Sequence, residues 1–298
     1  MVQKTNRDDP QPLPGKRTIS NAMTKRLLMN WAQKTVLVTG GGSGIGKEIT
    51  RLMINRGAHV IVATLLDEEI QALKQDLPQG RGTLTGIAID LTSDNAIAGL
   101  MNTLEARSLV PTVLVNNAGS GLLGAHKDLD REKMRKVLDL NIQVLTEMCS
   151  VFAEKLINRN LGGSILNVAS IGAFVPVPHL AAYTASKHYV LSFTHSLAHE
   201  LAPYGIHVGA LCPGITRTKI YDSMGLKTEK QSKGSISDHI DAFAMDADKV
   251  ALCAIHAIET NKRLALPGIN RAAPLFRLLP PRFTSWVLYK FVGDRAVS

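Results

Sequence analysis

Aromatic residues and cysteines are scarce in this chain. Phe, Trp and Tyr together make up 5% of the 298 residues, and there are three cysteines, Cys149, Cys212 and Cys253. Proteins that read nucleic-acid bases usually combine a basic folded face with aromatic stacking platforms, so we expect no nucleic-acid partner. Three widely separated cysteines form neither a disulfide framework nor a close-spaced metal cluster. We therefore expect reduced thiols, an intracellular, cytoplasmic location and no bound metal.

Long apolar runs are also missing. No stretch approaches the roughly 18 apolar residues that a membrane-spanning helix needs. The first twenty residues, MVQKTNRDDPQPLPGKRTIS, lack the apolar core of a secretory signal. The composition, 45% hydrophobic and 20% charged, is instead typical of a globular protein with a large buried core.

Positive charge is concentrated at the two ends of the chain. Residues 1–34 carry a net charge of +5 and residues 262–298 carry +6, whereas the long middle part carries −2. We expect residues 1–30 to be a basic, flexible extension and residues 268–298 to be a basic, apolar segment. The simplest role for the latter is to cover the substrate cleft. Peripheral contact of the basic ends with an anionic membrane surface is the alternative.

Six short β-branched runs alternate with helical patterns from Lys34 onwards. The runs are TVLVTG, AHVIVATL, GTLTGIAIDL, VPTVLVNNAG, LGGSILNVAS and GIHVGALCPG. Strands that alternate with helices predict a parallel sheet covered on both faces. The sequence therefore predicts one doubly wound, Rossmann-type α/β domain over residues 31–298, with residues 215–250 as a substrate lid.

The first predicted strand runs into a glycine-rich turn, TGGGSGIG, which opens a helix. The spacing of Gly40, Gly44 and Gly46 differs from the G-x-G-x-x-G fingerprint. It meets the same physical need, which is a tight turn with backbone amides close to a pyrophosphate. A glycine turn without a ligand is the alternative. The position between a strand and a helix favours a dinucleotide.

Tyr183 and Lys187 lie four residues apart in the segment AAYTASKHYV. On a helix this spacing puts the phenol and the ammonium on one face. An ammonium near a phenol favours the phenolate and lowers the pKa of the tyrosine from its reference of about 10. The pair is a candidate acid–base device, although Tyr-x-x-x-Lys also arises by chance.

With the motifs that surround them, these segments resemble the short-chain dehydrogenase/reductase family, of the ordinary length, from about Lys34 to about Pro267. The further matches are Asp90–Leu91 after the third strand, NNAG at 116–119, Asn141 in a helix, Ser170 thirteen residues before Tyr183, and PGITRT at 213–218. Each match is weak alone, but their agreement in order is specific.

The resemblance implies a catalytic set of four residues. Tyr183 would pass a proton to or from a carbonyl or hydroxyl oxygen, and Ser170 would hold that oxygen. Lys187 would bind the nicotinamide ribose and lower the tyrosine pKa, and Asn141 would keep a water in a proton relay. The implied cofactor contacts are Gly40, Ser43, Gly44, Ile45, Gly46, Thr64, Asp90, Leu91, Asn117, Ala118, Gly119, Tyr183, Lys187, Pro213, Gly214, Thr216 and Thr218.

The choice between NADP(H) and NAD(H) depends on the end of the second strand. An acid there binds ribose hydroxyls and repels a 2′-phosphate, but this chain has Thr64 at that position. No Arg or Lys lies at 64–66 or in the glycine turn at 41–43. Because Ser43 and Thr64 have hydroxyls that can donate to a 2′-phosphate, we expect NADP(H) to be favoured over NAD(H).

These residues predict hydride transfer between a nicotinamide and a small-molecule ketone or secondary alcohol, a bulky or apolar one if the C-terminal segment lines the cleft. A non-catalytic dinucleotide-binding redox sensor or scaffold is the alternative, and an isomerase or dehydratase using a transient hydride is a third. We expect a homodimer or homotetramer. His195 and His199 have a metal-ligand spacing on a helix, but no third ligand accompanies them, and a packed helix face is the better interpretation.

Overall fold

The computed structural model describes residues 29–77, 81–217 and 244–292. Through these residues runs a seven-stranded parallel sheet of order β3-β2-β1-β4-β5-β6-β7. Its strands are β1 (Thr35–Thr39), β2 (His59–Thr64), β3 (Thr83–Ala88), β4 (Val113–Asn116), β5 (Gly163–Val168), β6 (Ile206–Leu211) and β7 (Leu264–Ala265). The predicted doubly wound parallel fold is confirmed.

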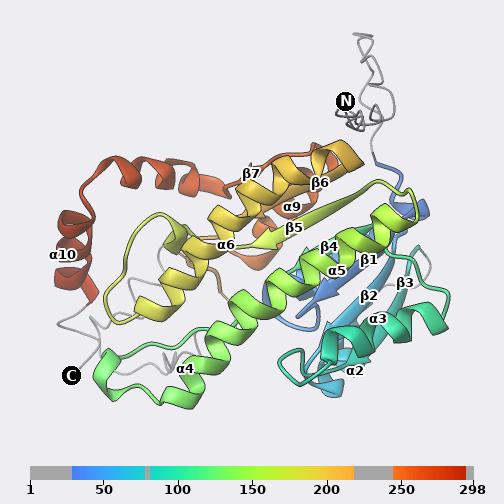
Figure 1. Ribbon diagram of the computed structural model, residues 1–298, viewed down its shortest axis with the longest axis horizontal. Coiled ribbons are helices and arrows are strands. Elements are labelled where there is room, and N and C mark those ends of the chain that lie inside the picture. Colours follow the sequence, from blue (N-terminus) through green and yellow to red (C-terminus); the bar gives the residue numbers. More distant parts are fainter. Residues whose placement is uncertain (1–28, 78–80, 218–243, 293–298) are drawn as a thin grey trace, which may run out of the picture.

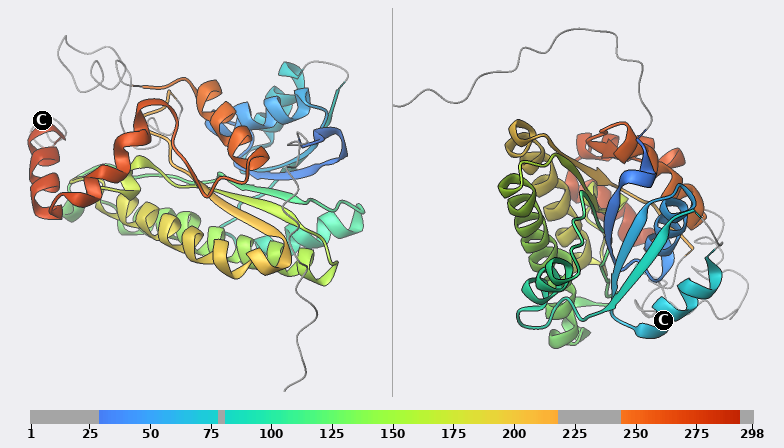
Figure 2. Two further views of the ribbon diagram at one scale, coloured as in Figure 1. Left: turned by 90° about the horizontal axis from the view of Figure 1, so that it is seen from above. Right: turned by 90° about the vertical axis from the view of Figure 1, so that its right-hand side faces the viewer.

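Helices cover both faces of the sheet (Figures 1 and 2). One face is covered by α1 (Gly44–Asn55), α2 (Asp67–Asp76) and α9 (Ala247–Glu259), and the other by α3 (Ala96–Ala106), α5 (Leu145–Asn158) and α6 (Ala181–Glu200). The remaining helical elements are η1 (Trp31–Gln33), η2 (His126–Asp128), α4 (Arg131–Leu138), η3 (Asp139–Val144), η4 (Ile171–Ala173), η5 (Ala202–Tyr204), η6 (Gly268–Leu278) and α10 (Pro281–Val292).

The strands form this sheet because their side chains alternate between two apolar layers. Leu37 and Ile61 contribute to the core under α3, α5 and α6, whereas Val36 and Val60 contribute to the core under α1 and α9. All four are fully buried. A strand buried on both faces reads as a continuous apolar run, which is why the six longer strands are visible in the sequence. β7 was not predicted, because two residues are too few to show a pattern.

The sheet positions the predicted site through its strand order. β1 is flanked by β2 on one side and by β4 on the other, so the chain changes direction across the sheet at this point. Ligands of such sheets bind outside the carboxyl ends of the strands at this switch point. The glycine turn and the segments after β4, β5 and β6 all follow the carboxyl ends of strands.

The described residues include only parts of the two chain ends and of the predicted lid. The extension over 1–30 lies almost entirely outside the described residues, and the lid over 215–250 lies mostly outside them. The segment from residue 268 forms η6 and α10. Within the described ranges, no helix is both long enough and apolar enough to cross a bilayer.

Candidate active site

The turn between β1 and α1 is held by the segment that follows β4. Thr39 Oγ1 accepts hydrogen bonds from the main-chain N–H groups of Asn117 and Ala118, at 3.1 and 3.0 Å. Asn117 Nδ2 donates to the carbonyl of Gly40 at 2.9 Å. A Cβ at Gly46 would lie 2.2 Å from that same carbonyl oxygen, so no larger residue fits there. The structure thus joins two predicted cofactor segments into one unit.

The first turn of α1 suits an anionic ligand. Ser43 precedes the helix in an extended conformation and its side chain makes no capping hydrogen bond, and the first turn has no acid. Gly44 has a φ of +52°, which favours glycine. Ile45 packs its half-buried side chain against the core. Amides at such a helix start, together with the helix dipole, can hold a pyrophosphate.

The end of β2 carries a carboxylate that was not predicted. The buried Thr64 hydroxyl donates to the carboxylate of Glu69, in the first turn of α2. A Cβ built on Gly42 would lie 2.8 Å from a Glu69 carboxylate oxygen and 3.2 Å from Thr64 Oγ1. Glu69 therefore occupies the corner between the glycine turn and β2. The sequence showed Thr64 at this position but not Glu69, because it is the first turn of α2 that brings residue 69 back over the strand end.

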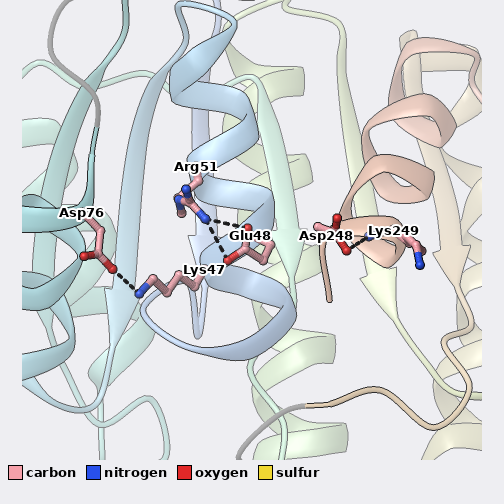
Figure 3. Close-up of polar contacts among 6 residues, drawn as sticks. All are labelled: Lys47, Glu48, Arg51, Asp76, Asp248 and Lys249. Atoms are coloured by element: carbon pink, nitrogen blue, oxygen red, sulfur yellow. Dashed lines mark hydrogen bonds and ion pairs between the residues drawn. The ribbon is translucent and has the colours of Figure 1, made fainter. Parts of the chain in front are cut away.

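The lysine next to the glycine turn points to the other end of α2. Lys47 Nζ lies 2.5 Å from an Asp76 carboxylate oxygen, and Glu48 pairs with Arg51 on the same helix (Figure 3). The hydrogen bond and charge of Lys47 lower the pKa of Asp76. Lys47 is thus committed to Asp76 and does not offset the Glu69 charge.

The predicted adenine pair lies next to this corner. The N–H of Ile89 donates to the carbonyl of Thr64 at 2.7 Å, which holds the chain after β3 beside the end of β2. Asp90 accepts hydrogen bonds from the Thr92 hydroxyl and N–H, at 2.6 and 2.9 Å, and these bonds lower its pKa. Leu91 is buried in the core. Both residues therefore reach the same edge of the sheet as the glycine turn.

Three predicted catalytic side chains meet over the end of β5. Lys187 Nζ donates to the carbonyl of Val168 at 3.0 Å and lies 5.8 Å from the centroid of the Tyr183 ring. Ser170 is the N-cap of η4, and its Oγ accepts the Gly172 N–H at 3.0 Å. α6 presents the tyrosine and the lysine on one face, as their spacing predicted.

The pKa values of this group differ from expectation in one respect. Burial raises the pKa of Tyr183, and a hydrogen bond with the Ser170 hydroxyl opposes this rise. Burial also lowers the pKa of Lys187 to about 8. We expected Lys187 to lower the tyrosine pKa, but the pKa is raised, and burial is the largest cause. The phenol is therefore protonated at neutral pH.

Asn141 lies in a π-helical turn, η3, between α4 and α5, and is fully buried. Its Nδ2 donates to the carbonyl of Ser120 at 2.9 Å and to Ser186 Oγ at 3.0 Å, and its Oδ1 accepts the Ser120 N–H at 3.0 Å. π turns inside helices occur often at functional sites. The side-chain amide thus connects the segment after β4 to α6, between Tyr183 and Lys187. A Cβ on Gly119 would lie 3.1 Å from Asn141 Oδ1 and 3.3 Å from Lys187 Nζ.

The segment after β6 closes the same edge of the sheet. The carbonyl of Pro213 accepts the N–H of Ile171 at 2.8 Å, which ties this segment to the serine loop. Thr216 is buried and donates its hydroxyl to the carbonyl of Gly214 at 3.0 Å. A Cβ on Gly214 would lie 2.6 Å from the Asn270 side chain. Thr218, also predicted to contact the cofactor, lies outside the described residues.

Sequence reasoning missed His179, four residues before Tyr183. Both ring nitrogens are shielded from solvent and have no hydrogen-bond partner among the described residues, and the ring stacks on Tyr289 of α10 at 6.0 Å. Arg277 of η6 lies over the Phe174 ring at 5.2 Å and donates to the carbonyl of Ala173 at 3.5 Å. The C-terminal segment therefore packs against the loop between Ser170 and Tyr183. The sequence led us to expect this segment over the substrate cleft, but it did not indicate which residues make the contact.

One member of the histidine pair on α6, His199, contacts a cation. His199 Nε2 lies 2.7 Å from Arg263 Nη1 and accepts its hydrogen bond. Among the described residues, no three His, Cys, Asp or Glu side chains are placed to hold a metal ion.

Comparisons with known proteins point to one family. A model of the short chain dehydrogenase family matches residues 34–229. The probable oxidoreductase EphD of Mycobacterium tuberculosis is 28% identical over 273 residues, which cover 87% of this chain. Those residues cover 46% of EphD, so this chain spans less than half the length of that relative.

Two solved structures carry a nicotinamide cofactor. A short-chain dehydrogenase from Sphingobium yanoikuyae in complex with NADPH is 26% identical, with a TM-score of 0.71, over 82% of this chain and 91% of its own. A 4-hydroxyisoleucine dehydrogenase complexed with NADH is 26% identical, with a TM-score of 0.66, over 76% and 91%. The braced glycine turn, the half-buried Tyr183 and the buried Lys187 thus lie on a fold whose relatives bind either dinucleotide. With about two thirds of its length matched by the family model, this chain belongs to the short-chain dehydrogenase family.

Proposed function

We propose that this protein is an NAD(P)-dependent oxidoreductase that transfers a hydride between the nicotinamide and a ketone or secondary alcohol. The observation that carries the proposal is the meeting of Tyr183, Lys187, Ser170 and Asn141 at the same sheet edge as the braced glycine turn. When bound, the nicotinamide supplies the hydride. The protein's own residues hold the substrate and move the proton.

In reduction, Tyr183 acts as the general acid. Burial keeps its phenol protonated at neutral pH, so it can donate to the carbonyl oxygen as negative charge develops there. The Ser170 hydroxyl donates a second hydrogen bond to the same oxygen. A positioned acid of this kind contributes about 10²–10⁴ in rate.

Lys187 then restores the proton. With its pKa lowered to about 8, it exchanges protons readily near neutral pH. The Asn141 side chain uses both of its donor hydrogens and its oxygen on Ser120 and Ser186, so it positions the relay.

The cofactor preference turns on Glu69. A carboxylate beside Thr64 accepts hydrogen bonds from free ribose hydroxyls and repels a 2′-phosphate, which supports NAD(H). The Thr64 hydroxyl already donates to Glu69, so it does not donate to a phosphate in this arrangement. The sequence-based preference for NADP(H) is the competing proposal, and it requires Glu69 to leave this corner.

For the substrate we propose a bulky or apolar ketone or alcohol. Phe174, His179 and Tyr289 bring rings to the loop between Ser170 and Tyr183, where the substrate oxygen would be held. The predicted homodimer or homotetramer and the cytoplasmic location are further proposals, and sedimentation velocity tests the first.

The test is a panel of cyclic, aryl and aliphatic ketones assayed with NADPH and with NADH. We expect consumption of one cofactor with at least one bulky ketone. Tight cofactor binding, seen by nicotinamide fluorescence, with no turnover of any ketone or of the corresponding alcohols would instead support the redox-sensor alternative.

A further inference from the structure

The C-terminal end of the described chain exposes an unusual amount of apolar surface. Eight of the fourteen exposed large hydrophobic side chains in the described residues lie between 269 and 289. Leu278 is 80% exposed and Trp286 is 59% exposed. Figure 1 shows η6 and α10 together at the end of the molecule opposite to α2 and α3. Concentrated exposed apolar surface of this kind marks an interaction site.

The exposed face of α10 is both aromatic and basic. Its exposed side chains are Arg282, Phe283, Trp286, Tyr289 and Lys290, which lie on one side of the helix, whereas Thr284 on the other side is buried. A helix that packs only against its own protein places its aromatic residues inward. Here Phe283 and Trp286 point outward, and Tyr289, although it stacks on His179, is still 45% exposed; Arg282 and Lys290 flank these rings.

The charge of this segment has one sign. Between Glu259 and Asp294 the sequence has no acidic residue and six basic ones, namely Lys262, Arg263, Arg271, Arg277, Arg282 and Lys290. On the neighbouring helix α6, His195 is close to two of these cations. Its pKa is lowered by burial and then by the positive charges of Arg277 and Arg263. The surface formed by η6 and the exposed face of α10 is therefore positive as well as apolar.

The positive charge distinguishes between two possible binding partners of this surface, a second copy of the chain and an anionic membrane. A second copy of the chain in a symmetric dimer would place the same patch against itself, so that cations would face cations without an acid between them. An anionic lipid headgroup layer complements the cations. Trp and Tyr rings favour the boundary between headgroups and acyl chains, and Lys and Arg extend to the phosphates.

We propose that η6 and the exposed face of α10 form a docking surface for an anionic membrane, with Trp286 and Phe283 entering the headgroup boundary and Arg282 and Lys290 contacting lipid phosphates. This function goes beyond the oxidoreductase activity and does not rest on it. Because η6 also packs against the serine loop at Ala173 and Phe174, docking places the substrate side of the enzyme next to the bilayer.

The test is flotation of the full chain with vesicles of phosphatidylcholine, with and without phosphatidylserine. We expect binding to the anionic vesicles that weakens as salt is raised from about 0.1 to about 0.5 M. Each cation near an anionic surface contributes on the order of fivefold in affinity. The double variant Arg282→Gln/Lys290→Gln should therefore bind roughly 25-fold more weakly, whereas Lys74→Gln/Arg107→Gln, at the opposite end of the molecule, should bind like wild type.

Tryptophan fluorescence gives an independent readout. The chain has two tryptophans, and Trp31 is buried and donates to Glu259 at 2.7 Å. A blue shift on adding anionic vesicles should therefore come from Trp286 and disappear in Trp286→Phe. Trp286→Ser should lower vesicle binding, and Leu252→Ser, which removes an exposed apolar side chain on α9, should not. Unchanged melting temperatures show that the variants fold.

Three results would overturn the proposal. The first is equal binding to vesicles with and without phosphatidylserine. The second is wild-type binding by the Arg282/Lys290 variant, with binding lost instead on deletion of residues 1–28. The third is a dimer that dissociates in Trp286→Ser while vesicle binding persists, which would assign this face to a second copy.

Discussion

The two ends of the predicted cofactor crevice are built differently. At the catalytic end, Asn141 and Lys187 are buried and tied to three elements by hydrogen bonds of about 3 Å. At the adenosine end, Thr64 is buried, but its partner Glu69 is half-exposed, and Leu65 and Leu66 beside it are exposed. On the proposed function, the difference means that proton transfer would depend on a buried, hydrogen-bonded network, whereas cofactor choice would depend on one half-exposed side chain, Glu69, at the edge of the sheet.

The strongest test of the catalytic end is the variant Tyr183→Phe. We expect kcat to fall by about 10²–10⁴, because the transferable proton is lost, while nicotinamide cofactor binding changes little. Tyr189→Phe on the same helix, which removes a hydrogen bond to Thr146, is the matched control. Wild-type kcat in Tyr183→Phe would remove the tyrosine from the mechanism.

Asn141→Ala should break the network without touching the proton donor. It leaves the N–H and the carbonyl of the half-buried Ser120 without their partner, at a cost of up to about 1–3 kcal/mol for each group left unpaired, whereas the Ser186 hydroxyl keeps its hydrogen bond to the Tyr183 carbonyl. We expect a lower melting temperature and a lower kcat. Gln143→Ala, on the exposed side of the same π turn, should change neither. Equal stability of the two variants would show that the network is not rigid.

The pH dependence of the reaction rate is a further test of the catalytic end. The pKa of Lys187 is lowered to about 8, so the lysine is protonated below that pH and loses its proton as the pH rises through it. Ketone reduction needs the protonated relay, and we expect its rate to fall about tenfold per pH unit above pH ~8. Alcohol oxidation needs the opposite state and should rise over the same range. A reduction rate that stays flat from pH 7 to about 10 would contradict this assignment.

At the adenosine end we expect a smaller effect, on the preference between the two cofactors. Glu69→Gln removes a charge from the 2′ side, and like-charge repulsion at a partly solvated edge is about 1–2 kcal/mol. The ratio of kcat/KM for NADPH to that for NADH should therefore rise roughly 5- to 30-fold. Glu68→Gln, the exposed neighbour in the same first turn, should leave the ratio unchanged. If wild type already prefers NADPH and Glu69→Gln has no effect, the sequence-based preference stands and Glu69 does not reach the ribose.

The smallest effect is expected from the extension. Deleting residues 1–28 removes basic residues that precede the described chain, and it should leave kcat/KM and the melting temperature nearly unchanged. A fall of more than a few degrees in the melting temperature would show that the extension contributes to the core.

The features that could be predicted from the sequence are those whose positions depend on the local pattern of residues along the chain. The longer strands could be predicted because strands buried on both faces read as continuous apolar runs. The Tyr183–Lys187 face could be predicted because residues four apart share a face of a helix. Glu69 could not, because its position depends on how the first turn of α2 packs over β2. The π turn at Asn141 gave no signal in LDLNIQVL, and the stacking of Tyr289 on His179 joins segments 110 residues apart.

The central claim is that this protein moves a hydride from a nicotinamide to a carbonyl carbon while Tyr183 supplies the proton. The most direct measurement uses NADH or NADPH with deuterium at C4 of the nicotinamide and a ketone that the panel shows to be consumed, with the alcohol product analysed by mass spectrometry and NMR. We predict deuterium on the carbinol carbon of the product with wild type, and no labelled product with Tyr183→Phe over the same time. Product without deuterium on that carbon from either face of the labelled nicotinamide, or no product while the cofactor remains bound, would contradict the account.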